Sequence, residues 1–196
     1  MKIRVALALV SAALLSACGL NSVPTAEENA KAKWADVQAS YQRRADLIPN
    51  LVATTRGAAA SEGQILTDVI NARARATQVQ VTADDLTDPA KVAQFQAAQD
   101  QLSGTLSRLL VTVEQYPQLQ SQANFQTLMS QLEGTENRIN IAIRDYNGAV
   151  QSYNTTIRTF PDAIGAKIFY GAKPMTPFQA KAGADTAPTV DFGNGS

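Results

Sequence analysis

The pattern of apolar positions is most regular between Phe125 and Phe160, where it predicts one long helix. Every seventh residue of this stretch is large and mostly apolar, and the positions three and four residues later are mostly small or apolar. This is the heptad stripe of a helix that packs along one side of a core. At ~1.5 Å per residue the helix is on the order of 54 Å long, so it needs helical partners along its whole length.

Three other segments carry the same kind of pattern. The first predicted helix has a cap at Thr25 and continues through Pro49, where we expect a kink because the apolar phase persists beyond the proline. Glycines weaken the pattern at residues 57–63, and it resumes from residue 65 to residue 79. A third helix is predicted to start at Asp88-Pro89 and to end at Tyr116-Pro117, directly before the long one. Together these segments predict an all-α fold, an up-and-down four-helix bundle with long helices.

The C-terminal part differs in pattern from the bundle. Pro161 is predicted to end the long helix, and apolar residues from Ala163 to Phe169 predict a short helical turn that folds back on the bundle end. We therefore place the bundle at residues 26–170. Residues 171–196 are small, polar and glycine-containing without periodicity, which predicts a disordered tail.

The N-terminus is typical of an exported lipoprotein. Lys2 and Arg4 precede an apolar run from Val5 to Leu15, which is too short to span a membrane as a helix. A small-residue cleavage site follows and ends at Cys18, the only cysteine of the chain. We therefore predict a signal peptide at residues 1–17, a lipid attachment site at Cys18 and a tether at residues 18–25. The alternative is an ordinary secretory signal with an incidental cysteine.

Lipid attachment at Cys18 predicts where the protein works. Several acyl chains, such as palmitate, at ~0.8 kcal/mol per buried CH₂ would hold the chain on a membrane. The membrane partner is then reached through Cys18, at the extracytoplasmic face of a bacterial cell envelope. Gly19, in place of an aspartate, favours the outer membrane if the organism is Gram-negative.

Composition excludes several classes of activity. Removing residues 1–17 takes away two of 17 basic side chains, which leaves 15 against 17 acidic ones and a net charge of −2. Such a chain lacks the basic excess of a nucleic-acid-binding protein. It contains no histidine, the commonest general base and metal ligand, and no serine-nucleophile motif. We therefore expect no catalytic residues, no metal and no cofactor.

Two polar motifs could bind ligands but also have structural interpretations. Tyr146-Asn147 and Tyr153-Asn154 repeat seven residues apart, as in a ligand motif, yet both tyrosines fall on the core stripe, where packing explains them. Asp84, Asp85 and Asp88 could bind calcium, but they lack the alternating ligands of an EF-hand loop. We interpret them as a solvated loop with a helix cap.

Arg44 and Glu136 interrupt the apolar stripes of their helices. Measured from the shared end of two antiparallel helices, they lie at similar depths, ~24 Å and ~21 Å. We therefore predict that they face each other as a largely buried, hydrogen-bonded pair that fixes helix register. A charged site for a partner or ligand is the functional alternative.

Several sequence blocks resemble the LemA family. They are Tyr41-Gln42-Arg43-Arg44-Ala45-Asp46-Leu47-Ile48-Pro49-Asn50-Leu51-Val52, Tyr116-Pro117 with Asn124-Phe125, Thr135-Glu136-Asn137-Arg138-Ile139, Tyr146-Asn147, Tyr153-Asn154 and Phe160-Pro161. The resemblance runs from about Trp34 to Phe169. It implies a four-helix bundle on the outer face of a bacterial membrane without established enzymatic activity. Relatives held by one transmembrane helix differ from this chain, which carries a lipoprotein cleavage site instead.

These observations favour a non-catalytic, membrane-anchored helical bundle that serves as an envelope scaffold or protein-interaction module. Its envelope protein partners are not identified by the sequence. The alternative is a ligand-binding bundle or a histidine-free envelope hydrolase, which requires a pocket lined by convergent carboxylates.

Overall fold

The computed structural model describes residues 21–58 and 62–179, and these residues form helices without any strand. Four helices are long: α2 (Ser22–Ala58), α3 (Gly63–Gln78), α4 (Pro89–Val113) and α6 (Ala123–Thr156). Four are short: the 3₁₀ helix η2 (Ala83–Thr87), α5 (Pro117–Gln120), α7 (Asp162–Gly165) and the π-helical turn η3 (Ala166–Tyr170). The predicted all-α class is confirmed.

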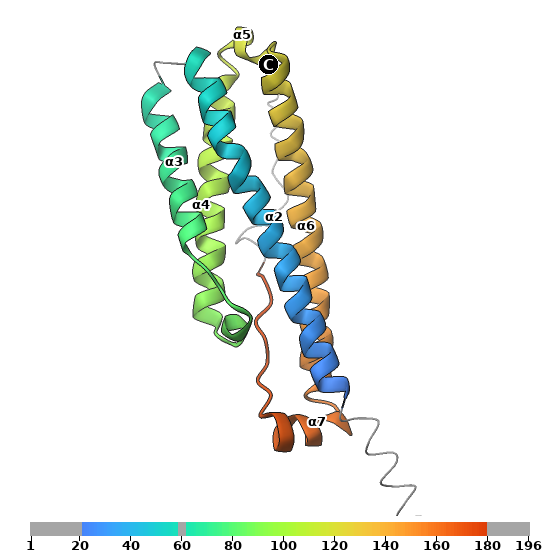
Figure 1. Cartoon of the computed structure of the whole chain (residues 1–196). Coiled ribbons are helices and arrows are strands. Elements are labelled where there is room, and N and C mark those ends of the chain that lie inside the picture. The colour runs from blue at the N-terminus through green and yellow to red at the C-terminus, as the bar shows by residue number, and fades with distance from the viewer. Residues whose placement is uncertain (1–20, 59–61, 180–196) are drawn as a thin grey trace, which may run out of the picture.

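The long helices lie side by side and give the molecule an elongated shape (Figure 1). Helix α2 packs along α6, while α3 and α4 form a hairpin beside α2. Chain direction reverses from each long helix to the next, so the α5 end and the α7 end lie at opposite tips of the molecule (Figure 1).

The core consists of two apolar clusters stacked along the long axis. The cluster toward the α7 end is rich in aromatic residues and centres on Trp34, which is 1% exposed. Its rings are Trp34, Tyr41, Phe95, Tyr146, Tyr153 and Phe178. The cluster toward the α5 end is mainly aliphatic and includes Ile48, Leu51, Leu66, Val69, Leu102, Leu106, Leu109 and one buried aromatic residue, Phe125. Burial of these stripes explains why four amphipathic segments assemble.

Helix α2 continues through Pro49, as the apolar phase predicts. A proline has no N–H, so the carbonyl of Ala45, four residues earlier, loses its helical donor. Arg73 of α3 replaces that donor, since its Nε lies 2.7 Å from the Ala45 oxygen. A side chain from the neighbouring helix therefore satisfies the defect that the proline creates.

The predicted start of α4 is confirmed, and α6 begins at Ala123, two residues before the apolar stripe that predicts it, but the predicted end of α6 is wrong. Asp88 caps α4 by accepting a 2.9 Å hydrogen bond from the N–H of Ala90, and Gln122 is the residue before α6. Helix α6 ends at Thr156 rather than at Pro161. Its last turn therefore unwinds before the proline that was expected to stop it.

At the N-terminus the helix begins earlier than the sequence pattern indicates. Helix α2 starts at Ser22, so the tether predicted for residues 18–25 is wrong over its last four residues. Thr25 does not cap the helix; its hydroxyl donates to the carbonyl of Asn21 within the first turn. Residues 1–20, with the predicted signal peptide and Cys18, lie outside the described residues.

The tail predicted to be disordered from residue 171 is ordered over residues 171–179. Gly171 adopts a positive φ of 54°, which turns the chain out of η3 into an extended segment. This segment, which we call the strap, runs from the α7 end back along the helices (Figure 1). Met175 and Phe178 are 5% and 6% exposed, because they complete the aromatic cluster. Residues 180–196 lie outside the described part of the chain.

Candidate functional site

A polar cluster around Arg44 occupies the middle of the molecule, between the two apolar clusters. The Arg44 residue is 3% exposed. Its Nη1 donates to Ser103 Oγ at 2.7 Å, and its Nη2 donates to Gln99 Oε1 at 2.9 Å. Gln99 in turn donates to the carbonyl of Ala76 at 3.1 Å. One guanidinium thus connects α2 to α4 directly and to α3 through a glutamine.

The structure brings Arg44 and Glu136 together but does not bury both. Arg44 Nη1 lies 3.3 Å from Glu136 Oε2, as the similar depths on their helices predict. The Glu136 side chain is 53% exposed, so the predicted mutual burial is wrong. The reason is that Ser103 and Gln99 of α4 supply the buried acceptors, while the carboxylate reaches the guanidinium from the solvent side.

Tyr41 lies on the same face of α2, one turn before Arg44. The guanidinium carbon stands 4.9 Å from the centre of the Tyr41 ring, within the range of a cation–π contact. Burial raises the pKa of the Tyr41 hydroxyl to about 12, and the nearby Arg44 charge acts in the opposite direction. Tyr41 therefore stays protonated at any physiological pH.

The strap is held by the two Tyr-Asn pairs that stood out in the sequence. Asn154 Oδ1 accepts from Met175 N at 2.9 Å, and its Nδ2 donates to the Met175 carbonyl at 2.8 Å. Asn147 bonds both backbone groups of Phe178 in the same way, at 2.8 and 3.0 Å. The hydroxyl of Tyr146 donates to the carbonyl of Thr176 at 2.8 Å. Both tyrosines are buried in the core and the Tyr146 hydroxyl reaches a partner, as the packing interpretation predicts. The two asparagines add a role that it did not include, since they bind the extended backbone of the strap.

The spacing of this amide ladder follows from helix geometry. Seven residues of α6 rise ~10.5 Å, and three extended residues of the strap span ~10 Å, so consecutive heptad positions meet every third strap residue. Asn140 lies one further heptad before Asn147, on the same side of α6, and is exposed. Asn140 lies near Phe178 and Gln179, the end of the described part of the strap.

An open groove between α4 and α6 continues from the end of the strap. One hollow of about 330 Å³ begins at Phe178 and Gln179 and includes Asn140, Arg44 and Glu136. A second of about 350 Å³ shares Arg44, Ser103 and Glu136 and extends toward the α5 end. Its other lining residues are Leu106, Ser107, Leu110, Met129, Leu132 and Glu133. We call the two hollows together the α4–α6 groove. It has an apolar wall and a polar centre at Arg44.

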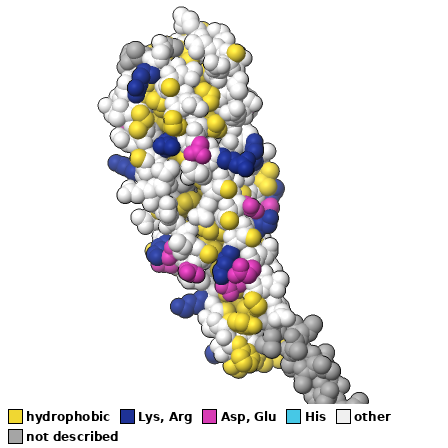
Figure 2. Space-filling model, viewed as in Figure 1, with side chains coloured by type: hydrophobic (Ala, Val, Ile, Leu, Met, Phe, Trp, Pro, Cys, Tyr) yellow, Lys and Arg dark blue, Asp and Glu magenta, His cyan; other side chains and the backbone are white. Residues whose placement is uncertain are grey.

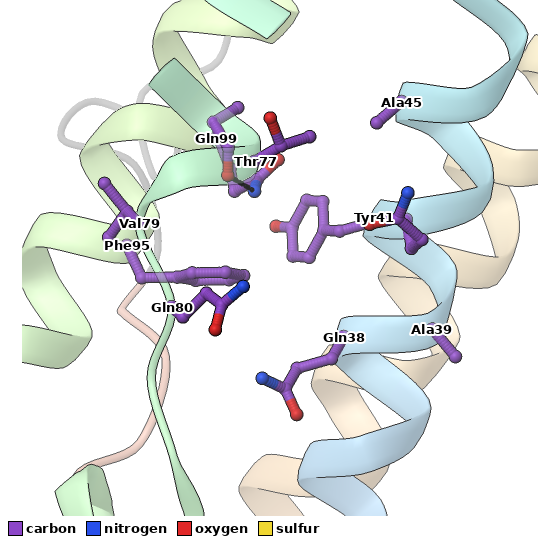
Figure 3. Close-up of a pocket in the computed structure, with 11 residues that line it drawn as sticks. Gln38, Ala39, Tyr41, Ala45, Thr77, Val79, Gln80, Phe95 and Gln99 are labelled. Atoms are coloured by element: carbon purple, nitrogen blue, oxygen red, sulfur yellow. Dashed lines mark hydrogen bonds between the residues drawn. The ribbon is translucent and has the colours of Figure 1, made fainter. Parts of the chain in front are cut away.

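A cavity of about 370 Å³ on the other side of Tyr41 is less suited to a ligand (Figure 3). Tyr41 points into it from α2, and Gln38, Gln42, Gln80 and Gln99 contribute amides to its lining. Three of these four amides already have partners within the protein. Gln38 donates to the carbonyl of Val81, Gln42 donates to Asp46, and Gln99 donates to Ala76. We therefore assign no function to this cavity.

The aspartates of the loop before α4 act as caps. Asp85 Oδ2 accepts from both the N–H and the hydroxyl of Thr82, while its Oδ1 contacts the Lys91 ammonium. These contacts, Lys91 foremost, lower the pKa of Asp85 to about 2. Asp88 caps α4. Within residues 21–58 and 62–179, no group of three or more His, Cys, Asp or Glu side chains could hold a metal ion.

The described part of the chain contains no helix that is both long enough and apolar enough to cross a bilayer. Cys18, the predicted lipid attachment site, lies before the first described residue. The fold and the site together define an all-helical domain that holds an extended segment of its own chain beside an open groove.

Comparison with known proteins identifies the family to which the chain belongs. The model of the LemA family matches residues 33–192, well over half of the chain, and the protein belongs to that family. The match extends beyond Phe169 and includes the strap. No curated protein matches the sequence significantly.

Proposed function

We propose that this protein is a non-catalytic, lipid-anchored helical bundle that binds other proteins of the bacterial cell envelope. In this proposal the four long helices form one up-and-down bundle, and acyl chains at Cys18 hold it at the extracytoplasmic face. Gly19 favours the outer membrane if the organism is Gram-negative. The lipoprotein-type N-terminus supports this cellular location.

The single observation that carries the binding role is the α4–α6 groove in line with the strap. Toward the α7 end, the strap already occupies the space beside α6. It is held there by asparagine amides and by its buried apolar side chains. The open α4–α6 groove offers the same kinds of group, an asparagine amide at the next heptad position, Asn140, and apolar side chains in its wall. These side chains are Leu106, Met129 and Leu132. We therefore propose that the occupant is an extended peptide segment of a partner protein, bound by strand-like backbone hydrogen bonds.

Of the described residues that line the groove, Arg44 alone is basic. Its guanidinium lines both hollows, and its Nε has no hydrogen-bond partner within the described residues. The lining also contains the carboxylates of Asp100, Glu133 and Glu136. The proposed partner segment is accordingly apolar and extended, without an excess of acidic residues.

Site-specific photo-crosslinking of the full chain in its own membrane tests this function. A photoreactive side chain at Ser107 faces the groove, and one at Asn71, which is exposed on α3, serves as the control. We expect one envelope protein to crosslink from Ser107 and not from Asn71. Asn140→Ala should weaken that crosslink without changing the melting temperature.

Three results would contradict the proposal. The first is equal crosslinking from both positions, and the second is no enrichment over an unrelated lipoprotein with the same anchor. The third is a Ser107 crosslink to residues 180–196 of the same chain, which would mean that the protein fills its own groove. Mass spectrometry of the crosslinked peptide separates this third result from a partner.

A further inference from the structure

Large apolar side chains gather on the surface at the α7 end of the molecule. Within the described residues, eight large apolar side chains are exposed, and five of these fall between residues 160 and 170. They are Phe160, Ile164, Ile168, Phe169 and Tyr170, which we call the end patch. The first of them is 81% exposed. Figure 2 shows hydrophobic atoms gathered at this tip.

The orientation of this segment is the reverse of what a core-facing helix requires. Gly165 and Ala166, the smallest residues of α7 and η3, are buried against the protein. Ile164 and Ile168, four residues apart, are 53% and 69% exposed. The predicted short helical turn is present as α7 and η3, but its large apolar side chains face solvent rather than the bundle end. Exposed apolar clusters of this kind mark sites of contact with another protein or with a membrane.

The end patch lies where the N-terminal part of the chain leaves the fold. Ser22, the first residue of α2, donates from Oγ to Asp162 Oδ1 of α7 at 2.7 Å. In Figure 1 the start of α2 lies at this tip, beside α7. Ser22 lies four positions after Cys18, and four steps of a fully extended chain span only ~14 Å. Acyl chains at Cys18 would therefore bring this tip to the membrane.

The segment that carries the end patch has an excess of basic side chains. Between residues 157 and 179 the chain carries three basic side chains, Arg158, Lys167 and Lys173, all exposed. Its one acidic side chain there, Asp162, is bonded to Ser22. Near the start of α2, Glu27 and Glu28 are both paired with Lys31. Apolar side chains accompanied by basic ones are typical of surfaces that bind anionic bilayers. Aromatic rings also favour the interfacial region.

We propose that the end patch inserts into the interfacial region of the bilayer to which the protein is anchored. The long axis then stands away from the membrane, and the α4–α6 groove is presented to partners at a distance from it. This inference rests on the anchor in the proposed function and adds a second, non-covalent attachment with a defined orientation.

The test uses the full acylated chain in vesicles of phosphatidylethanolamine and phosphatidylglycerol. Acylation consumes the Cys18 thiol, so a cysteine introduced as Ile168→Cys is the only thiol available to an environment-sensitive dye. Val111→Cys is the matched control, since Val111 is 63% exposed on α4 toward the α5 end. We expect lipid-borne quenchers to quench the dye at position 168, and aqueous iodide to quench only the dye at position 111.

Equal quenching by iodide at both positions would overturn the inference. So would protection of position 168 in native membranes but not in lipid vesicles, because a protein would then cover the end patch. The wild-type chain reports on the anchor separately. If it takes up dye, Cys18 is not acylated and the proposed anchor fails. If it takes up no dye but iodide quenches position 168, the anchor stands and the end patch assignment alone fails.

Discussion

The side-chain amide of Asn147 pairs with both backbone polar groups of Phe178, accepting from its N–H at 2.8 Å and donating to its carbonyl at 3.0 Å. This pair fixes the Phe178 ring against Trp34, with ring centres 5.7 Å apart, and against Phe95 and Tyr146. A residue remote in sequence therefore closes the aromatic core through an amide that imitates a neighbouring strand.

Asn147→Ala should detach the strap at Phe178. Two partly buried backbone groups then lose their partners, which costs ~1–3 kcal/mol of unfolding free energy. Trp34 is the only tryptophan, so its emission should shift to longer wavelength as water reaches the ring. Asn140→Ala, the same change one heptad earlier, is the control and should leave both urea stability and emission unchanged. Identical behaviour of the two variants would show that the ladder does not hold the strap.

Arg44 and Glu136 should differ strongly in their effect on stability. Arg44→Met removes the donor that satisfies Gln99 and Ser103 inside the protein, so we expect a loss of ~3 kcal/mol or more. Glu136→Gln changes an exposed contact and should cost less than ~1 kcal/mol. A double-mutant cycle from urea unfolding measures both effects and their coupling. Equal, large losses would indicate that Glu136 is buried in solution.

Pro49 and Arg73 should be coupled through the carbonyl of Ala45. Arg73→Ala leaves this oxygen without a donor and should cost ~1–3 kcal/mol, since Ala45 is only 3% exposed. In a Pro49→Ala background the restored N–H at position 49 can donate to the same oxygen. The cost of Arg73→Ala should then fall by at least half. Additive effects would mean that Arg73 acts by some other contact.

Tyr41 should make the protein sensitive to alkali. Burial raises its folded pKa to about 12, above the ~10 of an unfolded tyrosine. Below pH ~10 the hydroxyl is protonated in both states and stability is unaffected. Between pH ~10 and 12 only the unfolded state loses the proton, so stability falls as pH rises. Tyr41→Phe should make this part of a pH–stability profile less steep without flattening it, because burial also raises the pKa values of Tyr146 and Tyr153. An unchanged slope would argue against burial of the Tyr41 hydroxyl.

The sequence was sufficient where structure follows from local pattern. The apolar heptads of α6, the Asp88-Pro89 start of α4 and the depth match between Arg44 and Glu136 all depend on helix periodicity or caps, which are readable along the chain. The stripe and the cap can be deduced without knowledge of a remote partner, and the depth match needs only the antiparallel arrangement of two helices. The all-α class followed from the same signals.

The strap and the end patch could not be predicted in this way. Residues 171–179 have no periodicity because their backbone is held by side chains of Asn147, Asn154 and Gln96, far away in sequence. The heptad spacing of the Tyr-Asn pairs was the available signal, but it does not reveal which segment the amides bind. The exposed side of Ile164 and Ile168 depends on how α7 packs against the start of α2, which local propensity does not encode.

Attachment through Cys18 is the central claim, because the envelope partners and the membrane contact of the end patch both depend on it. The most direct measurement is detergent phase partitioning of the wild-type chain and of Cys18→Ser, combined with the intact mass of the mature protein. We predict that the wild-type protein begins at Cys18, carries acyl chains and enters the detergent phase, whereas Cys18→Ser with its signal removed is found in the soluble fraction. A mature wild-type protein without acyl mass, or membrane retention of the processed Cys18→Ser chain through all salt and carbonate washes, would contradict the account.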